Sequence, residues 1–258
     1  MTLLWLDEVG DGDRLRVGGK AYSLARLRRS GVPVPDGFVL EAGAALSADV
    51  RRDLAAACER LGGPLAVRSS STAEDTETAS FAGQYRTELD VRGSREAIEA
   101  LERCLAAAAA GSGYGSAMGV AGSGAMAVLV QRFVEPKAAG VAFTRHPADP
   151  TALLIEAYSG RGDALVSGTV SPDAYVVDRR TGALRSGPGH GALSPAEVPL
   201  VVERARRAEE VLGAPQDVEW AIGEDGAVLL QSRPITVEVE ERGDPRARRL
   251  TRANVGEV

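Results

Sequence analysis

The sequence is poor in aromatic residues, cysteine and histidine, and each shortage limits what the chain can do. Aromatic residues make up 4% of the 258 residues, so the core must depend on Val, Leu and Ala. Cys58 and Cys104 lie in helix-like stretches and are expected to be reduced, partly buried thiols rather than a disulfide or a nucleophile. His146 and His190 occupy unrelated Pro- and Gly-rich segments, which argues against a histidine metal site or a catalytic triad.

Long apolar runs and an excess of positive charge are also missing. No run of about 18 apolar residues occurs, so no membrane-spanning helix is expected, and the acidic N-terminal stretch does not resemble a secretory signal. The net charge of −6 disfavours binding to nucleic acid through bulk charge. With 44% hydrophobic and 26% charged residues, the composition is typical of a globular domain. The expected setting is the cytoplasm, with neither nucleic acid nor a membrane as partner.

Helical and extended periodicities are mixed along the chain, which indicates an α+β or α/β fold. Ser47 and Ser94 are the expected N-caps of two helices, and the Gly- and Ser-rich segment 111–124 is expected to be a mobile loop. The patterns predict helices over 18–31, 47–61, 94–110 and 195–212, and strands within 32–40, 65–67, 87–91, 126–134, 140–144, 152–158, 174–178, 183–185, 217–222 and 227–231.

Two segments of the N-terminal half could bind phosphate. Gly18 and Gly19 precede Lys20 at the start of a predicted helix, where backbone N–H groups and the helix dipole favour an anion. The spacing is not that of a P-loop, and a glycine turn beside a surface lysine is the simpler interpretation. Arg68 ends a predicted strand and could contact phosphate oxygens, or it could be neutralised by the acidic residues of the loop that follows. The SFAGQ segment of that loop could cover a phosphate chain.

The predicted hairpin near the C-terminal end carries the strongest chemical pattern. Period-2 alternation puts Asp217 and Glu219 on one face of the first strand, and Gln231 and Arg233 on one face of the second. If the register aligns these faces, an acid, an amide oxygen and a guanidinium converge. Such oxygen ligands suit Mg²⁺ that bridges nucleotide phosphates. The alternative is a cross-strand salt bridge on a solvated sheet face.

Taken together, five segments resemble the nucleotide-binding domain shared by phosphoenolpyruvate synthase, pyruvate phosphate dikinase and rifampicin phosphotransferase. The resemblance covers residues 18–236 and rests on five motifs in the same order. It implies an α+β ATP-grasp fold, in which two lobes clamp ATP and Mg²⁺. The motifs read GGKAYSLARLRRSGVPVPDGFVL, LAVRSSSTAEDTETASFAGQY, VLVQRFVEPKAAGVAFTRHP, IEAYSGRGDALVSGTVSPDAYVV and QDVEWAIGEDGAVLLQSRPIT.

The resemblance assigns nucleotide-binding and catalytic roles to individual residues. Lys20 and Arg68 would hold the transferred phosphates, and Gly83 and Thr87 fall where the loop after SFAGQ covers the nucleotide. The strand between the lobes would meet adenine through Gln131, Phe133 and Val134.

The C-terminal hairpin receives the metal and the transition-state roles from the same resemblance. Glu219 and Gln231 would hold magnesium with Asp217 in support, and Arg233 would stabilise the γ-phosphate in the transition state. The sequence departs from the family at Gly160–Asp163, where GRGD replaces the usual GLGE and shortens the reach of the acid.

The larger departure is that the phosphohistidine motif of these enzymes does not occur in the sequence. The leading hypothesis is an ATP-dependent phosphotransferase module that phosphorylates a histidine on a separate or deleted domain, for onward transfer to a small acceptor such as pyruvate or rifampicin. Residues 1–240 would form the ATP-grasp domain, and 241–258 a charged tail or linker. The alternatives are a stand-alone kinase or ligase that acts directly on a small molecule, and a non-catalytic nucleotide-binding subunit.

Overall fold

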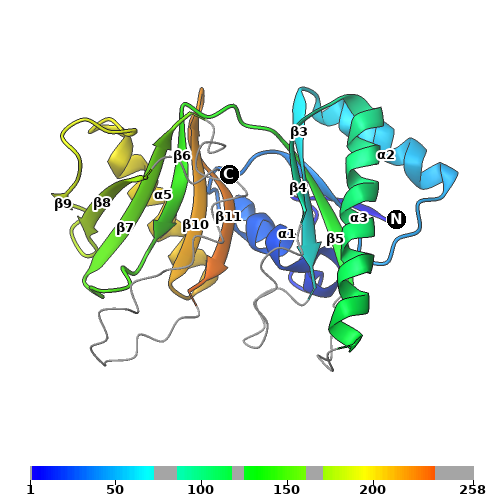
Figure 1. Cartoon of the computed structure of the whole chain (residues 1–258), viewed down its shortest axis with the longest axis horizontal. Coiled ribbons are helices and arrows are strands. Elements are labelled where there is room, and N and C mark those ends of the chain that lie inside the picture. The colour runs from blue at the N-terminus through cyan, green and yellow to red at the C-terminus, as the bar shows by residue number, and fades with distance from the viewer. Residues whose placement is uncertain (1, 73–85, 118–124, 161–170, 236–258) are drawn as a thin grey trace. The chain divides into compact units, whose positions relative to one another are not determined.

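The chain folds into two compact units, each built on one antiparallel sheet (Figure 1). The structure, a computed structural model, describes residues 2–72, 86–117, 125–160 and 171–235, without the side chains of 110–117. The first unit contains Met1–Arg29 and Pro35–Phe133, and the second contains Ser30–Val34 and Val134–Val258. Ser30–Val34 joins the second unit because the Leu229 N–H donates a hydrogen bond to the Pro33 carbonyl at 2.9 Å.

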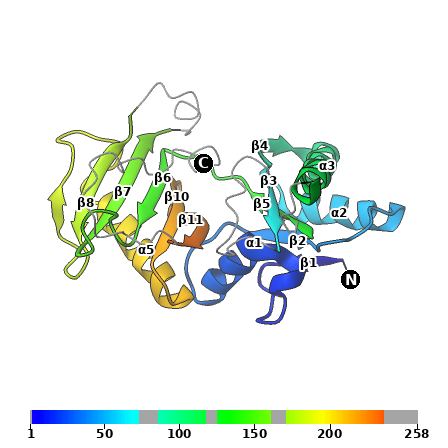
Figure 2. The same cartoon turned by 60° about the horizontal axis from the view of Figure 1, so that its bottom comes forward.

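Among its described residues, the first unit has five strands in the order β1-β2-β5-β3-β4 and three helices. Strand alternation divides its sheet into two faces, one covered by α2 and α3 and the other by α1 (Figure 2). The elements are β1 (Leu3–Trp5), α1 (Arg14–Arg29), β2 (Gly37–Leu40), α2 (Ala48–Leu61), β3 (Pro64–Ser71), β4 (Thr87–Arg92), α3 (Gly93–Ala117) and β5 (Met126–Arg132).

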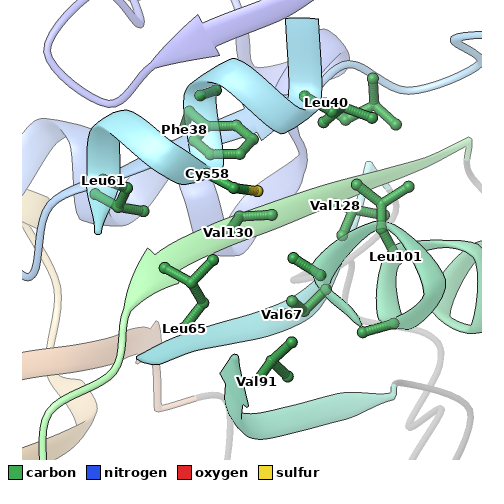
Figure 3. Packing of buried hydrophobic residues seen from close by; sticks show 14 of the residues in the cluster. Phe38, Leu40, Cys58, Leu61, Leu65, Val67, Val91, Leu101, Val128 and Val130 are labelled. Atoms are coloured by element: carbon green, nitrogen blue, oxygen red, sulfur yellow. The ribbon is translucent and has the colours of Figure 1, made fainter. Parts of the chain in front are cut away.

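The core of the first unit lies between its sheet and the helices α2 and α3 (Figure 3). Small and branched side chains fill this layer, as the scarcity of aromatic residues predicts. Both cysteines belong to it, and burial raises the pKa of each thiol to about 11, which keeps them protonated near neutral pH. The side chains labelled in Figure 3 are Phe38, Leu40, Cys58, Leu61, Leu65, Val67, Val91, Leu101, Val128 and Val130.

The second unit has six strands in the order β11-β10-β6-β7-β8-β9. The helix α5 (Glu197–Leu212) packs on β11, β10 and β6 through a fully buried stripe that includes Val201, Ala205 and Ala208. The strands are β6 (Ala138–Phe143), β7 (Ala152–Ser159), β8 (Asp173–Asp178), β9 (Leu184–Ser186), β10 (Gln216–Gly223) and β11 (Gly226–Pro234).

These elements confirm the α+β class and correct some of the predicted boundaries. The strand β1 was not predicted, and β3 continues through the serine run to Ser71. Ser94 lies inside α3 instead of capping it, because β4 turns directly into the helix at Gly93 and the Glu96 carboxylate accepts from the Arg92 N–H at 2.9 Å. Residues 111–117 continue the helix after the Ala-rich run, whose helix propensity is high. Within the described ranges, no helix is long and apolar enough to cross a membrane.

Because Gly140 of β6 has no side chain, the backbone of β7 and the Trp220 ring of β10 both lie close to its Cα. A Cβ at this position would lie 1.9 Å from the Glu156 carbonyl oxygen and 2.9 Å from Cζ2 of Trp220. Trp220 on β10 is fully buried, so its ring cannot move away from an added methyl group without disturbing the packed layer. β7 and β10 can therefore pack this closely against β6 only because residue 140 has no side chain.

We expect Gly140→Ala to destabilise the chain by about 1–3 kcal/mol, the usual cost of overpacking a well-packed core. Gly12→Ala is the control, because nothing lies within 4 Å of a Cβ at Gly12, and its effect should stay within about 0.5 kcal/mol. Equilibrium unfolding in urea measures both effects. Equal unfolding midpoints for the two variants would show that the sheet adjusts freely around residue 140.

Candidate functional site

The second unit brings together the four polar residues of the predicted hairpin. In the antiparallel register of β10 on β11, Glu219 lies directly opposite Gln231, and Asp217 lies opposite Arg233. Residues paired across strands point to the same face, so all four side chains lie on one side of the sheet. The exposed fractions of Glu219 and Gln231 are only 6% and 5%. The hairpin therefore carries a buried polar row rather than a solvated surface salt bridge.

Arg233 is held in place by Asp217. The Nε and Nη2 groups of Arg233 donate hydrogen bonds of 2.9 and 2.7 Å to the same oxygen, Oδ2 of Asp217. Burial raises the pKa of the Asp217 carboxyl, and the neighbouring guanidinium opposes that shift by lowering it. The structure thus gives Asp217 the role of a counter-ion that orients Arg233, beside the supporting metal role that the sequence suggested.

Gln231 presents an oxygen that fits a bound cation. Its Oε1 is buried and accepts no hydrogen bond from any described part of the chain. A buried acceptor without a donor costs free energy, and a cation at that oxygen would remove the cost. With the Glu219 carboxylate in the opposite position, the oxygen donors are of the kind that Mg²⁺ takes.

The protein alone does not offer this cation a complete set of ligands. Among the described residues, no three His, Cys, Asp or Glu side chains form a group that could hold a metal ion. Mg²⁺ usually binds through one or two carboxylates and completes its shell with water and substrate phosphates. The row on β10 and β11 is therefore suited to a metal that arrives with phosphate oxygens.

Glu156 of β7 lies on the same face and was not singled out from the sequence. Val141 of β6 pairs with Glu219 on one side and with Glu156 on the other, so Glu156 belongs to the same cross-strand row. Its side chain is half-buried, and burial, together with the negative charge of Asp217, raises the pKa of its carboxyl. The sequence feature that could have identified Glu156 is a single acidic residue within the otherwise apolar strand LLIEAY.

The predicted nucleotide-binding residues on β3, β4 and β5 share one face of the first unit's sheet. Arg68 pairs with Thr87 across β3 and β4, and Gln131 of β5 pairs with Ala66, two residues before Arg68. Alternation places all three on the face that α1 covers. Lys20 lies on α1 with an exposed fraction of 4%, and Arg68 with 3%, so the interpretation of Lys20 as a surface residue is wrong.

The turn before Lys20 is shaped by packing against β3. Gly18 has a φ of +77°, and a Cβ there would lie 2.3 Å from the carbonyl oxygen of Ser70. The Ala21 N–H donates to the Ser70 hydroxyl at 3.2 Å, so one donor of this helical turn is already satisfied by the protein. The close approach of α1 to β3 accounts for the glycine without an anion.

The remaining predicted residues fall into different parts of the structure. The Gln131 amide donates to the Pro35 carbonyl at 3.2 Å, and the Phe133 N–H donates to the Pro64 carbonyl at 2.9 Å. Val134 is the first residue of the second unit after β5. Gly83 lies outside the described residues, and so do the GRGD positions after Gly160 and the tail 241–258.

A comparison with protein families identifies the domain. The family described as the pyruvate phosphate dikinase AMP/ATP-binding domain matches residues 43–188 and 185–253. The chain belongs to this family. It is therefore a dikinase-type adenine-nucleotide-binding domain. The α+β ATP-grasp fold that the resemblance implied is confirmed by this membership and by the two helix-covered antiparallel sheets.

Relatives of this dikinase-type domain are longer proteins. The chain is 31% identical over 98% of its length to a probable phosphoenolpyruvate synthase of Methanothermobacter thermautotrophicus, of which it covers 49%. It is 36% identical over 93% of its length to a rifampicin phosphotransferase of a Streptomyces species, of which it covers 30%. The chain thus spans half or less of these relatives.

A solved structure shares the fold of the domain. The crystal structure of PH1788 from Pyrococcus horikoshii superposes with a TM-score of 0.50 at 14% identity, covering 85% of this chain and 93% of that one.

The raised pKa of Glu156 predicts a pH-dependent stability for this dikinase-type domain. The folded state keeps the Glu156 proton above the ordinary pKa of 4.5, where the unfolded chain loses it. Through this group, the free energy of unfolding therefore falls as the pH rises above about 4.5. Glu156→Gln removes that contribution, so the variant should gain stability relative to the wild type as the pH increases. Urea unfolding at a series of pH values, without nucleotide or metal, measures the difference.

Glu210→Gln is the control for this pH series, because Glu210 is exposed on α5 and its replacement removes the same charge from the same unit. If the two variants follow the same pH dependence, the burial of Glu156 has no influence on its titration.

Proposed function

We propose that this chain is the ATP-dependent phosphotransferase module of a dikinase-type system. It binds Mg–ATP and phosphorylates a histidine on a separate domain, which passes the phosphate to a small acceptor. Membership of an AMP/ATP-binding domain family supports the nucleotide. The names of the relatives, phosphoenolpyruvate synthase and rifampicin phosphotransferase, support transfer of phosphate to a small molecule such as pyruvate or an antibiotic.

The observation that carries the proposal is the polar row in which Glu219 and Gln231 are buried and Arg233 is partly exposed beside them. Glu219 and the unpartnered Oε1 of Gln231 would hold Mg²⁺, and Arg233 is fixed beside them by Asp217. When bound, Mg²⁺ neutralises negative charge on phosphate oxygens. The Arg233 guanidinium is already oriented before the nucleotide arrives, so it can stabilise charge on the transferred group without reorganisation.

The buried cations of the first unit support binding of the phosphates. Lys20 lies on α1, and Arg68 lies on the sheet face that α1 covers. Both side chains are almost fully buried. Thr87, directly opposite Arg68, has a buried hydroxyl without a partner among the described residues, which fits a polar ligand at this face. We assign Lys20 and Arg68 to phosphate oxygens, Gly83 and Thr87 to covering the nucleotide, and Gln131, Phe133 and Val134 to the adenine.

The carrier histidine is assigned to another domain because neither histidine of this chain suits the role. The ring of His146 is held in a turn, where its Nδ1 accepts N–H groups of Ala148 and Asp149 at 3.0 and 3.1 Å. His190 lies in an exposed Gly- and Pro-rich segment that lacks the sequence pattern of a phosphohistidine site. In a dikinase reaction, the histidine would keep the β-phosphate, with AMP and inorganic phosphate as the other products.

We expect labelled phosphate to move from ATP to a histidine domain of a relative in the presence of this chain. Label at the β-position should appear on the histidine, and label at the γ-position should appear as inorganic phosphate. Glu219→Ala should lower the transfer rate by two or more orders of magnitude, as the loss of a charge-stabilising group at a reacting centre commonly does. Rapid quench followed by separation of the labelled domain measures the rate.

Glu224→Ala is the matched control, since Glu224 is an exposed residue in the turn of the same hairpin and should leave the rate unchanged. Transfer to a small carboxylate or alcohol without the histidine domain would replace the proposal by a direct kinase or ligase. Tight ATP binding with no turnover, insensitive to Glu219→Ala, would indicate a non-catalytic subunit.

A further inference from the structure

We propose that Gln131 is a positioning residue for the base of the nucleotide. Its side-chain amide holds residues 131–133, the part of the predicted adenine-binding stretch that belongs to the first unit, against the residues that lead into β2, and it does so without contacting the base. The inference rests on the proposed function, which assigned Gln131 to the adenine, and it names how Gln131 acts there.

The Gln131 side chain is turned toward the backbone of the first unit. Its exposed fraction is 3%, and its Nε2 group donates a hydrogen bond of 3.2 Å to the Pro35 carbonyl. Gln131 is paired with Gly37 in the register of β2 on β5. A Cβ at Gly37 would lie 2.8 Å from Cγ of Gln131, so the glutamine side chain lies directly against this glycine. Gly37 therefore leaves the space through which Gln131 reaches Pro35.

The Pro35 carbonyl depends on a donor from outside its own strand. The paired residues of β2 and β5 end at Gly37 and Gln131, so Pro35 lies two residues beyond the last pair. Proline has no N–H group to continue a ladder, but its carbonyl still needs a hydrogen-bond donor when it is shielded from water. The Gln131 amide supplies that donor. The side chain thus holds the two segments together beyond the end of their pairing.

The next two residues are held in a similar way. The Arg132 N–H donates to the Asp36 carbonyl at 2.8 Å, and the Phe133 N–H donates to the Pro64 carbonyl at 2.9 Å. The Arg132 guanidinium also donates to the carbonyl of Leu61, the last residue of α2, at 3.0 Å. Each residue of the stretch 131–133 is therefore bonded to a backbone carbonyl of a neighbouring segment. A stretch that is ordered before the nucleotide arrives loses less entropy when it binds.

The place of this bond in the chain separates it from ordinary core packing. The chain re-enters the first unit at Pro35 and leaves it again after Phe133. The Gln131–Pro35 bond therefore joins the two segments at these points, next to the residues that we assign to the adenine. Loss of the bond should change the shape of the stretch 131–133 and weaken binding of the base, while the phosphate-binding residues Lys20 and Arg68 keep their positions on α1 and β3.

The test compares the affinities of the full chain for three kinds of ligand in the presence of Mg²⁺. These are ATP, ATP analogues whose base lacks the 6-amino group, N1, N3 or N7, and tripolyphosphate, which has no base. Gln131→Met keeps the length of the side chain and removes the donor. We expect it to weaken ATP and every analogue by the same factor of about two to ten, the worth of one hydrogen bond. Its affinity for tripolyphosphate should equal that of the wild type. Calorimetric titration measures each dissociation constant.

A second variant and a control accompany this measurement. Gln131→Glu has the same size as the wild-type side chain and lacks the donor when ionised, so it should weaken ATP and the analogues equally and spare tripolyphosphate. Glu59→Gln replaces an exposed residue on α2 of the same unit and should bind every ligand as the wild type does.

The other outcomes overturn the inference in distinct ways. A loss of affinity that disappears for one analogue shows that Gln131 contacts the group which that analogue lacks. Equal weakening of ATP and tripolyphosphate, or loss of folding in both Gln131 variants, shows a structural role for the whole unit. Unchanged affinities show that the bond to Pro35 has no influence on the base. A wild-type chain that binds neither ATP nor tripolyphosphate contradicts the proposed function itself.

Discussion

The candidate site depends on the register of β10 against β11. This pairing sets Glu219 opposite Gln231 and Asp217 opposite Arg233, and a slip of one residue would send one strand's polar side chains to the other face. Packing around β10 resists such a slip. Trp220 of β10 is fully buried, and it lies so close to Gly140 of β6 that no larger residue fits there. The same close packing that stabilises the second unit therefore also positions its functional oxygens.

In each unit, burying the polar groups of the candidate site costs folding free energy. In the second unit, Asp217 keeps a raised pKa despite its guanidinium partner, and the Gln231 oxygen has no donor among the described residues. In the first unit, Lys20 on α1 and Arg68 on β3 are almost fully buried, and the other face of the sheet is an apolar core. Buried polar and charged groups of this kind mark functional sites better than exposed charges do.

Local pattern in the sequence predicted the hairpin and its polar face, because alternation within a strand and the short turn at Glu224 are local properties. It missed Glu156, since the relation of β7 to β10 depends on β6 lying between them, and no local periodicity encodes that order. It also placed Lys20 at the surface, because the burial of α1 depends on its contact with Ser70 of β3. Which residues lie together at the site therefore depends on contacts between elements that are far apart in the sequence.

The fixed position of Arg233 has a consequence for the order of binding. The ion pair with Asp217 orients the guanidinium, but it also uses much of its charge, so Arg233 cannot by itself offset Glu219 and Glu156. A bare polyphosphate would meet two carboxylates on this face and be repelled, whereas a metal without a nucleotide would lack ligands. The metal would neutralise the carboxylates that repel the polyphosphate, and the phosphate oxygens would supply the ligands that the metal lacks. Nucleotide and metal are therefore expected to bind with positive coupling, in which each raises the affinity for the other by the same factor.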